Sequence, residues 1–424
     1  MKKKNSLNSK LLGSYMQSFF CIELHTDESL EDLNNLKEKT ISTLLHEYIH
    51  FLQDITTSFG LTNIISTVNH QKLVNKTIIE SDLETFKTPV EVDINTESDI
   101  YNALHSIFIG DFESDFDDFS KIIGYDLVPN ELVKGYEHHL YVSINFEKFG
   151  QNKSFNFGAI QIMESMAFIV ERNMFNNIKS PIYPYHIVEK IIEFIYPEIL
   201  GNDALIVSIC DFSLMLPDPG RFFMIFIKDI KTKGIVDVES AYNLFKHTIV
   251  RAKDVQSDIF QFYCSRVELA LISLKDYFTV EYFNDINNWF DQIFEKISTH
   301  KLENFTFWNE ILQGENIIQK RNKLIDLSAK FGFPLIVNND GQAVFSNPED
   351  LYPENIFSLR AIKEVSGVLK NEHTQCNMVK MCKNGIEDIT DHTCNTPWNR
   401  NLDNKLCPFT AITRMWGIDI KQPI

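Results

Sequence analysis

The sequence predicts an α+β fold that is mainly α-helical, with a small sheet beside one central helix. The chain has 424 residues, of which 44% are hydrophobic and 34 are Phe, so it can bury a large core. Residues 186–330 carry the apolar spacing of amphipathic helices over most of their length. Strand-like alternation is confined to short stretches. Helices should therefore dominate, and the sheets should be small.

The first half of the chain alternates short strands with two prominent helices. Residues 15–24 predict a strand, and the helix that follows should end near Gly60, where a helix stop is expected. Residues 61–125 give a mixed pattern. Residues 139–147 alternate in the manner of a strand, and residues 158–175 predict a buried helix.

The long helical region that follows includes predicted helices at 238–255 and 282–297, with a Pro-rich break at 215–220. The organisation of the chain then changes near residue 331. We therefore divide it into a main domain, residues 1–330, and a C-terminal part.

The C-terminal part, residues 331–424, begins with a predicted hairpin over 333–346 that closes at Asn339, Asp340 and Gly341. One helix and a Cys-rich module should follow it.

Charge and hydropathy exclude two classes of partner. The formal net charge is −18 and the basic residues form no patch beyond the initial "MKKK", so we expect no nucleic-acid partner. The longest apolar runs fall far short of the roughly 20 residues that a membrane helix needs. The seven Cys are not arranged as a secreted disulfide framework, so we expect a reducing cytoplasm. The oligomeric state is not predicted.

The stretch "TLLHEYIHFLQD", residues 43–54, carries the clearest functional pattern. Its apolar residues follow helical spacing, and His46, Glu47 and His50 lie on the opposite face. The two imidazoles are one turn apart, close enough to bind one metal ion. Two neutral imidazoles can hold Zn²⁺ with room for a third ligand and a water, and the adjacent carboxylate can act as the base for that water.

The motif "HEYIH" resembles the zinc-binding signature of the zincin metallopeptidases. The metzincin continuation fails, because Gln53 and Thr56 stand where that subclass has Gly and His. Gluzincins take a Glu from a later helix, and Glu164 in "GAIQIMESMAFIVE" is the best match. Phe168 stands where some members have an Asp that supports the first histidine. The resemblance implies a zincin-like core in the main domain and hydrolysis of a peptide or protein.

The apolar surroundings of Glu164 also favour it as the third ligand, independently of the resemblance. It is the only ionisable residue in "AIQIMESMAFIV", and a carboxylate among apolar side chains is costly unless it is paired or bound to a metal. A partner Arg or Lys, or a place at the solvent edge, would be the alternative. His70, Glu80 and Glu84 are rival third ligands.

Two further roles stay open on sequence alone. Asp54 or Glu171 is suitably spaced to hydrogen-bond a ligand imidazole. A donor to the oxyanion is expected from "GYEHHLYVS", residues 135–143, where we select His139 from a group that also includes Tyr136, His138 and Tyr141. The stretch "YPYH", residues 183–186, offers further donors.

The tail contains four cysteines within a segment that has little apolar material: Cys376, Cys382, Cys394 and Cys407. Their spacing differs from the tight pairs of common zinc ribbons. A second, structural Zn²⁺ would order the segment; an iron–sulfur cluster, unligated thiols or disulfides are the alternatives, and His373 and His392 are spare ligands.

The sequence therefore predicts a zinc metallopeptidase of gluzincin type with a peptide or protein substrate, in which Glu47 activates the water. Two alternatives come from other classes. Two His and one carboxylate can hold Fe(II) for oxygen chemistry. The chain could otherwise be a non-catalytic interaction protein with a regulatory, defence or toxin role.

Overall fold

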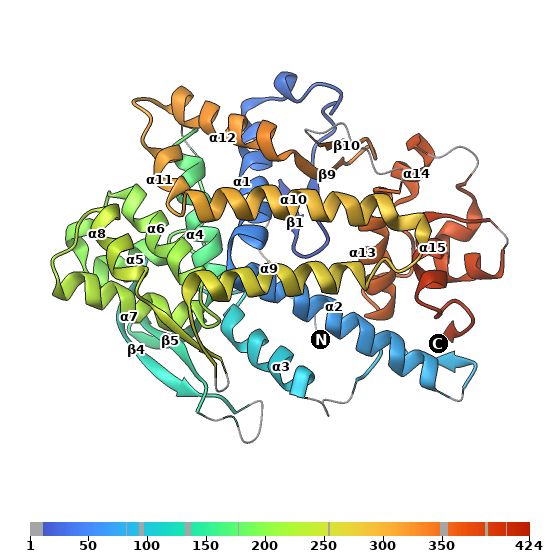
Figure 1. Cartoon of the computed structure of the whole chain (residues 1–424), viewed down its shortest axis with the longest axis horizontal. Coiled ribbons are helices and arrows are strands. Elements are labelled where there is room, and N and C mark those ends of the chain that lie inside the picture. Colours follow the sequence, from blue (N-terminus) through green and yellow to red (C-terminus); the bar gives the residue numbers. More distant parts are fainter. Residues whose placement is uncertain are drawn as a thin grey trace.

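The computed structural model describes residues 12–81, 83–92, 97–131, 136, 138–176, 178–252, 255–347, 355–385, 389–403 and 405–424. Helices account for most of them (Figure 1): α1 (Glu38–Thr56), α2 (Ser58–Glu80), α3 (Glu97–Ile109), α4 (Ala159–Arg172), α5 (Ile187–Ile195), α6 (Asp203–Leu214), α7 (Pro219–Thr232), α8 (Val238–Phe245), α9 (Ile259–Lys275), α10 (Asn284–Glu303), α11 (Phe307–Leu312), α12 (Ile317–Phe331), α13 (Phe357–Leu369), α14 (Val379–Gly385) and α15 (Pro408–Met415).

The strands form small separate sheets. One has the order β1-β2-β9-β10, from β1 (Gly13–Met16), β2 (Cys21–Leu24), β9 (Phe333–Asn338) and β10 (Ala343–Ser346); β2 and β9 are parallel and the other pairs antiparallel. A second, antiparallel sheet contains β4 (Ser120–Pro129), β5 (Leu140–Lys148) and β6 (Gln151–Phe157). Two pairs complete the set: β7 (Ile249–Ala252) with β8 (Val255–Asp258), and β3 (Thr85–Phe86) with β11 (Gln422–Pro423). The predicted class, mainly helical α+β with small sheets, is confirmed.

The first sheet draws its strands from both sides of residue 331, where the sequence predicts a domain boundary. The expected hairpin at 333–346 is present as β9 and β10, and β9 pairs with β2 near the N-terminus. The main domain and the C-terminal part thus share one sheet. Helix α13 follows as expected.

The single strand predicted for residues 15–24 is wrong, because these residues form the β1–β2 hairpin. Its turn places Ser18 and Phe20 at positive φ without a glycine. A hydrogen bond to helix α1 stabilises this turn, because the Ser18 N–H donates to Asp54 Oδ2 at 3.0 Å. A contact that spans 36 residues leaves no trace in the local pattern.

The helix stop predicted at Gly60 is also wrong. Helix α1 ends at Thr56, and Thr57 caps the new helix α2 by accepting a hydrogen bond from the Gly60 N–H at 3.1 Å. A Cβ on Gly60 would lie 2.5 Å from the Asp54 Cα. The glycine therefore permits α2 to pack closely on the last turn of α1, and it does not end a helix.

The helix predicted over 238–255 is only half correct. Helix α8 ends at Phe245, and the chain continues into the β7–β8 hairpin. Ile249 and Val250 begin β7, and β-branched residues favour such a strand. The predictions at 139–147, 158–175 and 282–297 are confirmed as β5, α4 and α10.

Helix α1 lies between the helices α5–α8 at one end of the molecule and the C-terminal helices α13–α15 at the other (Figure 1). It packs against β1, β2, α2, α4 and α10. Every residue from Ser42 to Thr56 is buried, the polar face included. Within the described part, no helix combines the length and apolar character needed to cross a membrane.

Candidate metal centre

Two helices bring three potential metal ligands together. His46 and His50 come from α1, and their Nε2 atoms are 3.2 Å apart. Glu164 comes from α4, which packs on α1, and its Oε2 lies 3.4 Å from His46 Nε2 and 3.5 Å from His50 Nε2. In the described part of the chain, this is the one group of His, Cys, Asp and Glu residues whose ligand atoms all lie within 4.8 Å of one another.

These spacings fit a tetrahedral zinc ion. Ligand atoms about 2.0–2.1 Å from zinc lie about 3.3–3.4 Å from each other along the edges of a tetrahedron. The three measured separations, 3.2, 3.4 and 3.5 Å, match such an edge. The side chains of His46 and His50 are 10% and 8% exposed, whereas that of Glu164 is 20% exposed, so solvent reaches the group from the Glu164 side.

The other ring nitrogens fix both imidazoles in the orientation that a metal requires. His46 Nδ1 lies 3.0 Å from Glu171 Oε2, and Ser42 donates to the other oxygen of that carboxylate. His50 Nδ1 lies 2.8 Å from Gln53 Oε1. The Gln53 amide is oriented by its Nε2, which donates to the Met163 carbonyl at 3.2 Å. Both Nδ1 atoms thus donate, and both Nε2 lone pairs point to the shared centre.

Glu47 stands beside this centre with its carboxylate anchored. Its Oε2 accepts a hydrogen bond from the Tyr15 N–H in β1 at 2.6 Å. The same tyrosine donates its hydroxyl to Asp54 Oδ2 at 2.9 Å, which fixes β1 against the end of α1. Asp54 therefore holds the β1–β2 hairpin, and of the two residues expected to support an imidazole only Glu171 does so.

The charges of this group favour the binding of a cation. Burial raises the pKa of Glu47, although the two histidines oppose the shift. Burial also disfavours ionisation of Glu164, but His50 and His46 outweigh it and hold its pKa well below its usual range. Burial lowers the pKa of His46, yet Glu164 and Glu171 outweigh that effect and raise it well above the ordinary value.

No arginine or lysine pairs with Glu47, Glu164 or Glu171 in the described part of the chain. This removes the alternative in which Glu164 is neutralised by a basic side chain. Two Nε2 lone pairs 3.2 Å apart also repel unless a positive charge lies between them. A metal ion would satisfy both requirements, and a proton is its competitor.

Tyr185 lies over the same group. Its ring centroid is 5.9 Å from that of His46 in an edge-on contact. Burial raises the pKa of the phenol, and Glu164, Glu47 and Glu171 raise it further. Next to Glu164, Ser165 accepts the Val188 N–H and donates to the Pro184 carbonyl at 3.1 Å, which holds the segment of Tyr185 against α4.

His139, the donor selected from the sequence, is elsewhere. Its ring contacts are with Phe108, Tyr136 and His138. Burial lowers its pKa, and His138 and Arg221 lower it further. Within the described residues, no hydrogen bond or ring contact joins it to the three ligands.

The rival third ligands also lie outside the group. Glu80 pairs with Lys76 at 3.8 Å, Glu84 is exposed, and neither these two nor His70 belongs to the three-ligand group.

The sequence did not identify Gln53 or Tyr185 as functional. Gln53 served only to exclude the metzincin pattern, although its place three residues after His50 puts it on the ligand face. Tyr185 was contained in the "YPYH" stretch without being distinguished from its neighbours. Its contact with His46 spans 139 residues and follows only from the packing of the 183–188 segment on α4.

The four cysteines of the tail lie apart from this centre and line one small cavity, together with Met378, Val379, Ile389, Thr390, Pro408 and Phe409. Burial raises the pKa of Cys376 and of Cys382 to about 12.

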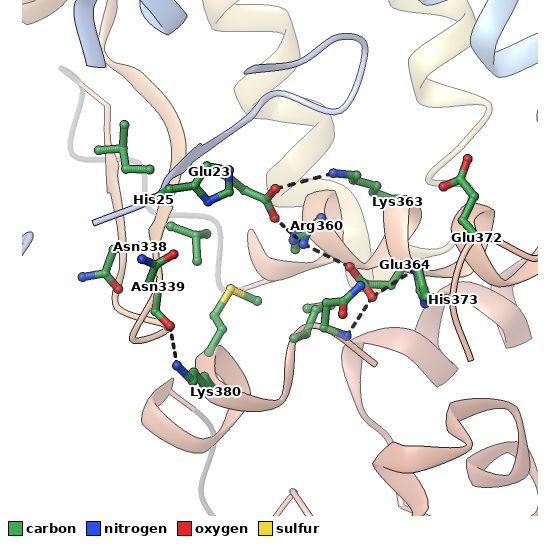
Figure 2. A pocket seen from close by; sticks show the side chains of 16 residues that line it. Glu23, His25, Asn338, Asn339, Arg360, Lys363, Glu364, Glu372, His373 and Lys380 are labelled. Carbon is green, nitrogen blue, oxygen red and sulfur yellow. Dashed lines mark hydrogen bonds and ion pairs between the residues drawn. The ribbon is translucent and has the colours of Figure 1, made fainter. Parts of the chain in front are cut away.

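A larger cavity of about 440 Å³ lies between the β2–β9 pair and helices α13 and α14 (Figure 2). Its charged side chains mostly pair with one another. Arg360 contacts Glu23 and lies 3.1 Å from Glu364, whose other oxygen accepts the Asn377 N–H at 2.9 Å. Of the candidate site residues singled out from the sequence, the spare ligand His373 lines it, whereas the three ligands, Glu47, His139 and the four cysteines do not. This network therefore links α13 to strand β2 of the first sheet.

Comparisons with family models, with curated proteins and with solved structures found no match to this chain.

We predict that Glu171→Gln weakens zinc binding, because it removes the charge that orients His46 and strengthens its Nε2 as a ligand. Loss of such a support typically costs about 10–100-fold in metal affinity. Competition with a chromophoric chelator would measure the change. Glu193→Gln is the matched control, since Glu193 lies on α5 with its side chain 55% exposed. Equal affinities in the two variants would refute the supporting role.

Proposed function

We propose that the chain is a zinc-dependent metallopeptidase of gluzincin type that hydrolyses a peptide or protein. One observation carries the proposal: two imidazoles and a carboxylate converge with zinc spacing, and the Glu47 carboxylate lies fixed beside them without a basic partner. A structural metal centre needs no free carboxylate at its edge. A hydrolytic centre does, because its water must lose a proton.

His46, His50 and Glu164 would hold the ion, and Glu171 and Gln53 would keep both imidazoles in the correct tautomer. When bound, zinc would supply Lewis-acid chemistry and lower the pKa of a coordinated water. Glu47 would take a proton from the attacking water and later pass it to the leaving amine. The Tyr15 N–H engages only one of its oxygens, Oε2. The other oxygen therefore serves as the base.

We assign the oxyanion donor to Tyr185 in place of His139. The Tyr185 ring packs edge-on against the first ligand, and the segment that carries it is hydrogen-bonded to the residue after the third. A phenol with a raised pKa keeps its proton and can donate it to a developing oxyanion. The expected place of the substrate carbonyl is therefore between Tyr185 and the metal ligands.

The same three ligands could hold Fe(II) for oxygen chemistry. Glu47 favours hydrolysis, because it adds a buried carboxylate that oxygen activation does not use. Addition of zinc or of iron to the metal-free chain separates the two functions, since the proposal requires zinc and not iron to support peptide hydrolysis.

We predict that Glu47→Gln lowers the rate of peptide hydrolysis by about 10²–10⁴-fold, the usual contribution of a general base. Bound zinc should be retained, since Glu47 is not a ligand. New peptide N-termini, counted by mass spectrometry in a pool of unfolded proteins, would measure turnover. Glu38→Gln is the control, because Glu38 is on the same helix with its side chain 65% exposed. Full activity of Glu47→Gln would contradict the assignment.

We predict that Tyr185→Phe lowers kcat by about 10²-fold with little change in KM, because the lost hydrogen bond forms mainly in the transition state. The same peptide assay measures both constants. Tyr141→Phe, in strand β5, should have no such effect. A loss in His139→Ala together with normal kcat in Tyr185→Phe would return the role to His139.

A further inference from the structure

Four cysteines from separate elements meet at one cavity in the C-terminal part of the chain. Cys376 precedes α14, Cys382 lies in α14, Cys394 lies in a short 3₁₀ turn, and Cys407 caps the N-terminus of α15. All four line a single cavity of about 20 Å³. A water molecule needs roughly 10–15 Å³ by the same measure, so the space suits one small occupant.

Hydrogen-bond donors point at the sulfurs. Arg400 Nη2 lies 3.5 Å from Cys394 Sγ, and Thr410 Oγ1 lies 3.6 Å from Cys407 Sγ. The Met378 N–H donates to Cys376. Such donors stabilise thiolates, and four thiolates around a divalent ion leave two negative charges in excess. The Arg400 side chain, only 2% exposed, lies beside the sulfurs while it also pairs with Asp391 at 2.7 Å, so its positive charge is shared between that carboxylate and Cys394.

A backbone hydrogen bond joins the part of the tail around Cys376 to the part around Cys394. The Cys376 N–H donates to the Cys394 carbonyl at 3.0 Å, and all four cysteines are free thiols. No three of the sulfurs lie within 4.8 Å of one another, so binding an ion requires their side chains to rotate inward. Met378, Phe409 and Ile389 contribute apolar surface to the same cavity.

We propose that Cys376, Cys382, Cys394 and Cys407 bind one structural zinc ion, separate from the His46–His50–Glu164 centre. The two spare histidines do not compete. His373 lies 3.6 Å from Glu364 and lines the larger cavity of Figure 2, and His392 is exposed. Neither lines the cysteine cavity, so the ligand set is four sulfurs.

The ion would hold α14 in place as a wall of the larger cavity. Met378 lines both cavities, and the adjacent Asn377 N–H donates to Glu364 on α13. On the other side of α14, a Cβ on Gly341 would lie 2.4 Å from the Met381 nitrogen, so the β9–β10 turn packs directly on this helix. The zinc ion thus ties the tail to the first sheet through α13 and α14.

The experiment uses the full chain with His46→Ala and His50→Ala, so that the first centre cannot contribute. We expect one zinc per chain by elemental analysis, and X-ray absorption showing four sulfurs at about 2.3 Å. Adding Cys394→Ser and Cys407→Ser should remove that zinc, whereas adding Cys264→Ser, an exposed cysteine outside the cluster, should not. Because no activity is measured, the result is independent of the proposed peptidase function.

Three results would overturn the proposal: no zinc in the His46→Ala/His50→Ala chain, iron with inorganic sulfide in place of zinc, or disulfides among the four cysteines in the unreduced protein. If the histidine variant does not fold, titration of wild-type protein with a mercurial decides the question. Modification of the four thiols should release one zinc per chain, and release of none would refute the site.

Discussion

The contact between α1 and α4 is constrained by a cluster of acids and imidazoles that has no arginine or lysine partner in the described residues. Glu47, Glu164 and Glu171 share one region with His46 and His50. The partners of this group include its own members, a serine hydroxyl, the Gln53 amide and one backbone N–H. Uncompensated burial of such charges is costly. A bound divalent cation would offset much of that cost, and we therefore propose a metal ion where α1 meets α4.

The surrounding elements each fix one member of this group. Helix α4 supplies both Glu164 and, two turns later, Glu171, so one helix places a proposed ligand and the carboxylate that contacts His46. The β1–β2 hairpin holds Glu47 through the Tyr15 N–H and is itself held to α1 by Asp54. The residue after Glu164 positions the chain segment of Tyr185. Contacts of α1 and α4 therefore position the residues proposed as ligands, base and donor.

Local patterns predicted the parts of the site that helical spacing determines. His46, Glu47 and His50 follow from one amphipathic turn, and Glu164 was found because a lone carboxylate stands in an apolar helix. Contacts between distant segments gave no such pattern. Tyr185 reaches His46 only through the packing of its loop on α4, and the β1–β2 turn depends on Asp54.

The errors in the fold have the same origin. The stop assigned to Gly60 treated a glycine needed for helix packing as a helix terminator, because the position of Asp54 beside it is a property of the folded chain. The parallel pairing of β2 with β9 joins segments about 300 residues apart and could not be read from either strand.

Anomalous diffraction at the zinc absorption edge, from crystals of the full chain grown with zinc, tests the central claim most directly. The account predicts a peak about 2.0–2.2 Å from His46 Nε2, His50 Nε2 and a Glu164 oxygen, with Glu47 near it but not bound. The absence of a peak at this position, or a zinc ion there held by other residues, would contradict it.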